Sequence, residues 1–220
     1  MEEDSQVKSR DRVSDHGEVF TAEREVKEMC DLVQSEIEKM DSNVLEPACG
    51  NGNFLAEILS RRMKLVHDRY GGDSRFEQMA LTALGSLYGI DIMADNAQEC
   101  RNRLYSLWNE GYSADGDDDH VRSFARRILD CNIVCGNALT FHCVDENQND
   151  TSEPIVFSEW EFMPDGKAVE RKYSFEKTLD SSYHESRNEA VQLELDLFDS
   201  DSCLKDKDGL ISCTEHDYLS

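Results

Sequence analysis

The sequence predicts an α/β protein with an open, mostly parallel sheet, to which a β-hairpin and an acidic tail are appended. Three apolar runs, at 44–45, 87–92 and 132–134, are typical of buried strands. Segments with apolar residues at helical spacing separate these runs. Alternation of strands and helices favours parallel pairing, because parallel neighbours need a long crossover connection that is usually a helix.

Length and charge fit one domain with tails. The 220 residues are 39% hydrophobic, which suffices for one core. We divide them into a flexible amino terminus (1–14), a main α/β domain (15–145), a hairpin-and-helix extension (146–198) and an acidic flexible tail (199–220). The net charge of −24 argues against a broad DNA-binding surface, since DNA affinity depends on basic residues that neutralise phosphates.

Nothing in the sequence indicates a membrane span or a secretion signal. No apolar run is long enough to cross a bilayer, and the acidic start has neither the basic nor the apolar region of a signal peptide. We therefore expect a cytoplasmic protein whose eight cysteines are free thiols. Cys131 and Cys135 are expected on one face of a strand as buried thiols, and no metal site is expected.

The first helix is expected over 22–39, with Thr21 as its N-cap. Its apolar residues recur at helical spacing: Val26, Met29, Cys30, Val33, Ile37 and Met40.

A glycine turn follows the first strand and precedes a helix expected over 54–67. Gly50 and Gly52 let the backbone approach a ligand closely, and the first N–H groups of the helix point at it. Glu46 would repel a phosphate but accept hydrogen bonds from an ammonium or a ribose hydroxyl. These residues favour a nucleoside that carries a positive group, such as S-adenosylmethionine. The alternative is an ordinary strand-to-helix turn.

The run Leu45-Glu46-Pro47-Ala48-Cys49-Gly50-Asn51-Gly52-Asn53-Phe54 resembles the cofactor motif of N6-adenine DNA methyltransferases of bacterial restriction-modification systems. The resemblance covers about residues 15–139. It implies a Rossmann-like class I methyltransferase sheet with helices on both faces, S-adenosylmethionine as cofactor and DNA as substrate. Within the motif it implies cofactor contacts from Glu46, Pro47, Ala48, Gly50, Gly52 and Phe54.

Two further matches flank this motif. In the resembled enzymes a Gly-x-x-x-Thr-Pro segment contacts the methionine end of the cofactor; Gly17 and Thr21 match, and Ala22 replaces the proline. Asp91 ends the second predicted strand, where an acid binds ribose hydroxyls in nucleoside-binding α/β folds. The resemblance places Ile92 against the adenine ring. The alternative is that Asp91 caps the helix expected over 94–110.

The third strand leads into Gly136-Asn137-Ala138-Leu139, where the resembled enzymes carry Gly-Asp-Ala-Leu. Their aspartate accepts a hydrogen bond from the adenine amino group, and the amide oxygen of Asn137 can do the same without the charge. The preceding helix, expected over 121–129, carries the basic cluster Arg122, Arg126 and Arg127. We interpret this cluster as a solvated face, with a DNA-backbone contact as the alternative.

The acceptor motif of the resembled enzymes, Asp/Asn-Pro-Pro-Tyr/Phe, is absent, since no two of the three prolines are adjacent. Pro164-Asp165-Gly166 instead predicts a hairpin turn. Its strands carry Trp160, Phe162, Tyr173 and Phe175, interpreted as sheet packing or as a platform for a base. A last helix is expected over 184–198.

Two hypotheses follow. The chain is an adenine-specific DNA methyltransferase, or the cofactor-binding portion of one, whose acceptor motif comes from a partner such as a second methyltransferase or restriction subunit. Alternatively it is an inactive S-adenosylmethionine-binding regulatory or interaction protein, which the missing motif, the net charge and the acidic tail favour.

Overall fold

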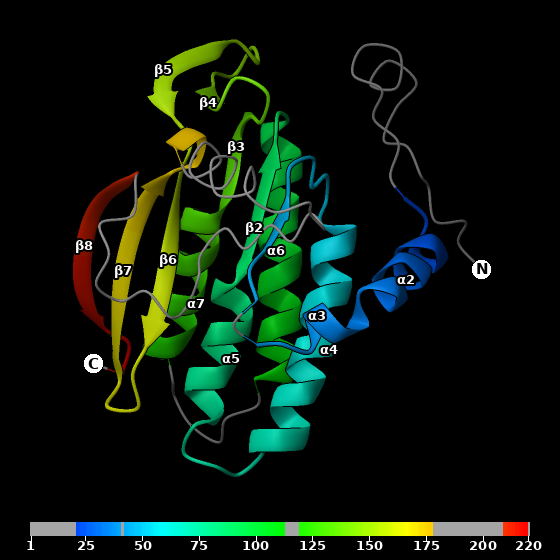
Figure 1. Cartoon of the computed structure of the whole chain (residues 1–220), viewed down its shortest axis with the longest axis vertical. Coiled ribbons are helices and arrows are strands. Elements are labelled where there is room, and N and C mark those ends of the chain that lie inside the picture. Colours follow the sequence, from blue (N-terminus) through cyan, green and yellow to red (C-terminus); the bar gives the residue numbers. More distant parts are fainter. Residues whose placement is uncertain (1–20, 41, 113–118, 178–208, 220) are drawn as a thin grey trace, which may run out of the picture.

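The computed structural model describes residues 21–40, 42–112, 119–177 and 209–219. They form two sheets and a layer of helices (Figure 1). The elements in chain order are α2 (Glu23–Leu32), α3 (Gln34–Ile37), β1 (Val44–Glu46), α4 (Asn53–Tyr70), α5 (Phe76–Gly85), β2 (Leu87–Asp91), α6 (Ala94–Gly111), α7 (Asp119–Asn132), β3 (Ile133–Asn137), β4 (His142–Val144), β5 (Asp150–Pro154), β6 (Val156–Phe162), β7 (Lys167–Ser174) and β8 (Leu210–Asp217).

The first sheet has five strands in the order β1-β2-β3-β4-β5. The pairs β1–β2 and β2–β3 are parallel, as the sequence predicts, and helical crossovers connect them. β4 and β5 then add antiparallel, so the sheet is mixed. These two strands escape sequence analysis because they are short and polar, and β5 is largely exposed. The boundary predicted after residue 145 falls between them, inside this sheet.

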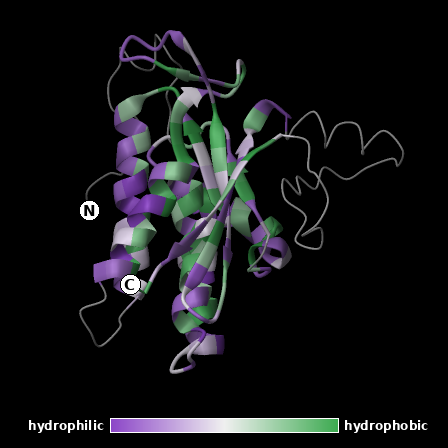
Figure 2. Ribbon diagram, turned by 90° about the vertical axis from the view of Figure 1, so that its left-hand side faces the viewer, coloured by the Kyte–Doolittle hydropathy of each residue, from purple (hydrophilic) through white to green (hydrophobic). Residues whose placement is uncertain are grey.

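Helices α4 to α7 cover one face of the parallel strands. Their buried side chains, such as Leu59, Leu84 and Leu104, join Leu87 and Ile133 in the main apolar cluster. Figure 2 shows hydrophobic residues concentrated between the helices and the sheet, while the outer helix surfaces are more hydrophilic. The α/β class predicted from the alternating pattern is therefore confirmed.

Among the described residues, no helix joins the apolar cluster on the opposite face of the sheet. Tyr88 and Ile90 of β2 point into a second cluster with Phe157, Tyr173 and Phe175, to which none of the helices α2 to α7 contributes. Within the described residues, the expected arrangement with helices on both faces is therefore wrong. The second sheet supplies this packing instead.

The second sheet has the antiparallel order β6-β7-β8. The predicted hairpin is confirmed, with Gly166 at φ 86° in its turn. The carboxyl-terminal end differs from the expected flexible tail, because β8 pairs with β7 along its length. Sequence analysis missed β8 because its side chains are mostly exposed and show no apolar alternation.

The aromatic side chains of the hairpin are buried in packing contacts rather than exposed to solvent. Trp160 lies edge-on to Phe124 of α7, with ring centroids 5.3 Å apart. Tyr173 pairs with Phe157, so these two side chains project from the same face of the hairpin. Phe157 and Trp160 are three residues apart on β6 and project from opposite faces, so Tyr173 and Trp160 do so as well. Both are at most 9% exposed. The platform interpretation is therefore wrong, and sheet packing is confirmed.

Some local predictions also need correction. The helix expected over 22–39 breaks at Val33 (φ −115°), and its N-cap is Ala22 rather than Thr21. Cys131 lies in α7 and only Cys135 lies on a strand, because α7 continues to Asn132. Four predictions concern residues outside the described ones: the loose start at 1–14, the Gly17 match, the helix at 184–198 and the tail at 199–208.

Candidate cofactor site

A cavity of about 580 Å³ lies at the carboxyl ends of β1, β2 and β3. Ligands of open α/β sheets bind at this edge, because the loops and helix N-termini that follow the strands converge there. The lining residues are Thr21, Glu46, Pro47, Ala48, Cys49, Gly50, Asn51, Asn53, Phe54, Asp91, Ile92, Met93, Asn96, Gly136, Asn137, Ala138 and Leu139. The structure thus brings together every predicted site residue except Gly52.

The turn before α4 depends on two glycines in the left-handed region. Gly50 has φ 53°, and Gly52, the N-cap of α4, has φ 85°. A Cβ on Gly52 would lie 2.7 Å from Sγ of Cys100 in α6. Gly52 therefore faces α6 rather than the cavity, and its absence from the lining follows from this close packing.

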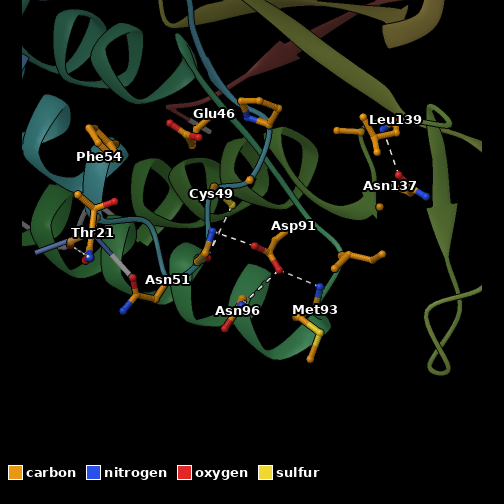
Figure 3. Close-up of a pocket in the computed structure, with 17 residues that line it drawn as sticks. Thr21, Glu46, Cys49, Asn51, Phe54, Asp91, Met93, Asn96, Asn137 and Leu139 are labelled. Atoms are coloured by element: carbon orange, nitrogen blue, oxygen red, sulfur yellow. Dashed lines mark hydrogen bonds between the residues drawn. The ribbon is translucent and has the colours of Figure 1, made fainter. Parts of the chain in front are cut away.

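Asp91 holds the turn and the start of α6 in place (Figure 3). Its Oδ2 accepts from the Gly50 N–H at 2.9 Å, and its Oδ1 accepts from the Met93 N–H at 2.8 Å and from Nδ2 of Asn96 at 3.3 Å. The N-cap of α6 is Met93 and no side chain caps this helix, so the interpretation of Asp91 as a helix cap is wrong; Asp91 instead fixes the turn that leads into α6. A carboxylate has about four acceptor sites, so Asp91 retains capacity for a ligand hydroxyl.

Glu46 is the second carboxylate of the cavity. Burial raises its pKa, and a hydrogen bond with the Ala48 backbone partly opposes this effect. Among the residues that the structure describes, the lining includes no lysine, arginine or histidine. Two carboxylates without a basic partner in the lining favour a cationic ligand and disfavour a phosphate.

Asn53 positions Thr21 at the end of the cavity that lies farthest from Asn137 (Figure 3). Its Nδ2 donates to the Thr21 carbonyl at 2.9 Å, and its Oδ1 accepts from Arg103 of α6. Sequence analysis missed the position of Asn53 in the cavity, although it stands inside the quoted motif. No sequence pattern reveals the contact, because Thr21 and Asn53 are 32 residues apart.

Asn137, the last residue of β3, lies at the other end of the cavity. Its Oδ1 accepts from the Leu139 N–H at 3.0 Å, and its Nδ2 donates to Asp150 at 3.2 Å. The amide oxygen keeps one lone pair for a ligand donor, as the predicted role requires. Ala138 and the 89% exposed Leu139 continue the wall.

The arginines of α7 have partners within the protein. Arg122 donates to Asn109, Arg126 stacks 3.6 Å from the centre of the Tyr105 ring, and Arg127 pairs with Glu170 at 2.9 Å. None lines the cavity. These contacts give the cluster a structural explanation, while the DNA-backbone contact stays an untested alternative.

Within the described ranges, no group of three or more His, Cys, Asp or Glu side chains is arranged to hold a metal ion. No helix there combines the length and the apolar character that a membrane span needs. Comparisons with known protein families, curated proteins and solved structures find no match to this chain.

Proposed function

We propose that this chain binds S-adenosylmethionine as the cofactor-binding part of a methyltransferase that acts on N6 of adenine in DNA. The observation that carries the proposal is the cavity at the strand ends, whose described lining contains Glu46 and Asp91 and no basic side chain. Its volume lies within the roughly 300–1,000 Å³ typical of small-molecule sites. S-adenosylmethionine brings a sulfonium and an ammonium, both of which a negative cavity attracts.

Phosphate-bearing nucleotides fit this cavity less well. A phosphate normally binds the free N–H groups of a glycine turn at a helix N-terminus. Here the Gly50 N–H already donates a hydrogen bond to Asp91. The carboxylate of Asp91 therefore puts a negative charge where a phosphate would lie. The same charge suits a ribose hydroxyl, which donates to it.

The resemblance to N6-adenine DNA methyltransferases implies a role for each of these side chains. Asp91 accepts from the ribose, Ile92 packs on the adenine, and Asn137 accepts from the adenine amino group. Glu46 and Thr21 lie toward the methionine end, where the carboxylate stabilises positive charge. The cofactor supplies the methyl group, and the chain's own residues hold and orient it.

The described residues do not complete a methyl acceptor site. The cavity lining contains one proline, Pro47, and no Asp/Asn-Pro-Pro segment that would align an exocyclic amine. We therefore propose that a second methyltransferase or restriction subunit supplies the acceptor motif and most DNA contacts, within a DNA methylation or restriction-modification system. The competing candidate, a regulatory S-adenosylmethionine-binding protein without transfer activity, is favoured by the same absence and by the net charge of −24.

Calorimetry tests the cofactor step. Titration of the full chain with S-adenosylmethionine and S-adenosylhomocysteine should show binding, with ATP as the phosphate-bearing control that binds at least tenfold more weakly. If the chain binds neither S-adenosylmethionine nor S-adenosylhomocysteine, the proposal is refuted.

A transfer assay separates the two candidates. Labelled S-adenosylmethionine and plasmid DNA are incubated with the chain, alone and with the product of the neighbouring reading frame. Label in DNA only when both polypeptides are present supports the split enzyme. Cofactor binding without transfer in either mixture supports the regulatory protein.

A further inference from the structure

The side-chain amide of Asn137 is held between two partners of opposite hydrogen-bonding character. Its Oδ1 accepts from the Leu139 N–H at 3.0 Å, and its Nδ2 donates to a carboxylate oxygen of Asp150 at 3.2 Å. A backbone N–H can only donate and a carboxylate can only accept, so both partners select the same orientation of the amide. Turning the amide over would lose both bonds and would place its oxygen against the charged carboxylate.

Asp150 reaches Asn137 because of the β4–β5 hairpin, which sequence analysis missed. β4 pairs with the end of β3, and β5 returns along β4, starting at Asp150. The loop between the two strands is fixed by Asp145, whose Oδ1 accepts from the backbone N–H groups of Asn147 and Asn149 at 2.8 and 2.9 Å. The carboxylate of Asp150 therefore has a defined place next to the Asn137 amide.

Because Asn137 lines the cavity, the orientation of its amide decides which ligands this end of the cavity accepts. In Figure 3 its oxygen lies on the side of Asp91 and the other labelled residues, and its nitrogen lies on the far side. A ligand therefore meets an acceptor with one lone pair available. The exocyclic amine of adenine donates to such an atom. Hypoxanthine carries a carbonyl oxygen at the same ring position, which would be unpaired and repelled.

We propose that Asp150 determines the base specificity of the site: by fixing the amide of Asn137, it favours adenine nucleosides over hypoxanthine nucleosides. The aspartate of the resembled enzymes has two equivalent oxygens and needs no orienting partner, whereas an asparagine does. Asp150 is a positioning residue, since it acts through Asn137 and does not itself line the cavity. This inference rests on the proposed function, because it requires the adenosyl group of the cofactor to lie beside Asn137.

The test compares binding of S-adenosylhomocysteine with binding of S-inosylhomocysteine, the same molecule with hypoxanthine in place of adenine. The unmutated full chain should prefer the adenine compound by at least about tenfold, because one ligand gains a hydrogen bond and the other leaves an acceptor unpaired. Asp150→Asn is isosteric and can pair with either orientation of the Asn137 amide. It should therefore reduce the preference at least about threefold. This ratio is unaffected by a loosening of the fold that weakens both ligands alike.

Two further variants complete the test. Glu153→Gln is the matched control: Glu153 is exposed on the same strand, and the same loss of charge there should leave the preference unchanged. Asn137→Asp in the Asp150→Asn background should restore the preference, because a carboxylate presents an acceptor in both orientations.

A preference that Asp150→Asn leaves unchanged, or that Glu153→Gln reduces equally, overturns the inference. A double variant that does not prefer adenine overturns it as well. Failure of the proposed function gives a different result: the unmutated chain then binds neither compound, and both proposals fall together.

Discussion

The carboxylate of Asp91, at the end of β2, accepts a hydrogen bond of 2.9 Å from the backbone N–H of Gly50, which follows β1. The neighbouring Cys49 N–H donates to the Ile90 carbonyl at 2.8 Å. Together these bonds dock the glycine turn onto β2. The shape of the proposed cofactor site is therefore set before a ligand arrives, which lowers the ordering cost of binding.

Replacement of Asp91 tests this arrangement. Asp91→Ala should weaken binding of S-adenosylmethionine by about 1–3 kcal/mol, since it removes an acceptor for the ribose and leaves the Gly50 N–H unpaired. It should also lower the free energy of unfolding by about 1 kcal/mol, because the Met93 N–H in the turn before α6 loses its acceptor. Calorimetry and denaturant unfolding measure the two effects. Asp68→Ala, an exposed change on α4, controls for net charge. Unchanged affinity in Asp91→Ala would count against the site.

Gly52 offers a test of packing beneath the turn. Gly52→Ala should lower the free energy of unfolding by at least about 2 kcal/mol, because it combines a left-handed backbone with a clash against Cys100. Gly72→Ala is the matched control: Gly72 has φ 80° and nothing within 4 Å of an added Cβ, so it should cost only about 1 kcal/mol. Cys100→Ala in the Gly52→Ala background should recover part of the loss. Equal costs at the two glycines would contradict the predicted clash.

The sequence predicted the parts of the fold that bury a continuous apolar run or apolar residues at helical spacing. β2 is an apolar run that is buried at four of its five positions, and the glycines marked the turn before α4. β4, β5 and β8 were missed because backbone pairing, rather than burial of apolar side chains, defines them. The residues predicted to line the site came from a local motif at 45–54 and from shorter matches at Thr21, Asp91 and Asn137. Their mutual contacts, Asp91 with Gly50 and Asn53 with Thr21, depend on the fold and leave no local pattern.

The pKa of Glu46 makes cofactor binding sensitive to pH. Burial raises this pKa, so the folded carboxyl stays protonated to higher pH than a free glutamate does. A cationic ligand prefers the ionised form, so affinity for S-adenosylmethionine should rise as the pH increases above 4.5 through the raised pKa, with release of a proton on binding. Calorimetry in buffers of different ionisation enthalpy detects that proton. Glu46→Gln should bind more weakly at neutral pH and show no such rise; a persistent rise would assign the proton to another group.

Glu170 lies on β7, and its side chain contacts β6, β8 and helix α7. The side chain is 2% exposed, and its carboxylate accepts from Ser158 of β6, Arg127 of α7 and His216 of β8, with Lys172 at 3.6 Å. Burial alone would raise the pKa of Glu170, but these bonds outweigh it and bring the pKa to about 2. The buried carboxylate thus helps to hold β8, whose own side chains bury little.

Glu170→Gln should lower the free energy of unfolding by about 2 kcal/mol at neutral pH, because a neutral amide replaces the buried carboxylate that accepts hydrogen bonds from Ser158, Arg127 and His216. The folded-state pKa lies below the ordinary value of 4.5, so the stabilisation is present above pH 4.5 and is lost as the pH falls toward 2. The difference between wild type and variant in urea unfolding should therefore shrink over that range. Glu161→Gln is the matched control on the same sheet: Glu161 is 43% exposed and pairs with Arg171 at 2.7 Å, so its loss should cost less than about 1 kcal/mol at every pH. Equal losses from the two changes would show that Glu170 is no more important to the sheet than an exposed ion pair.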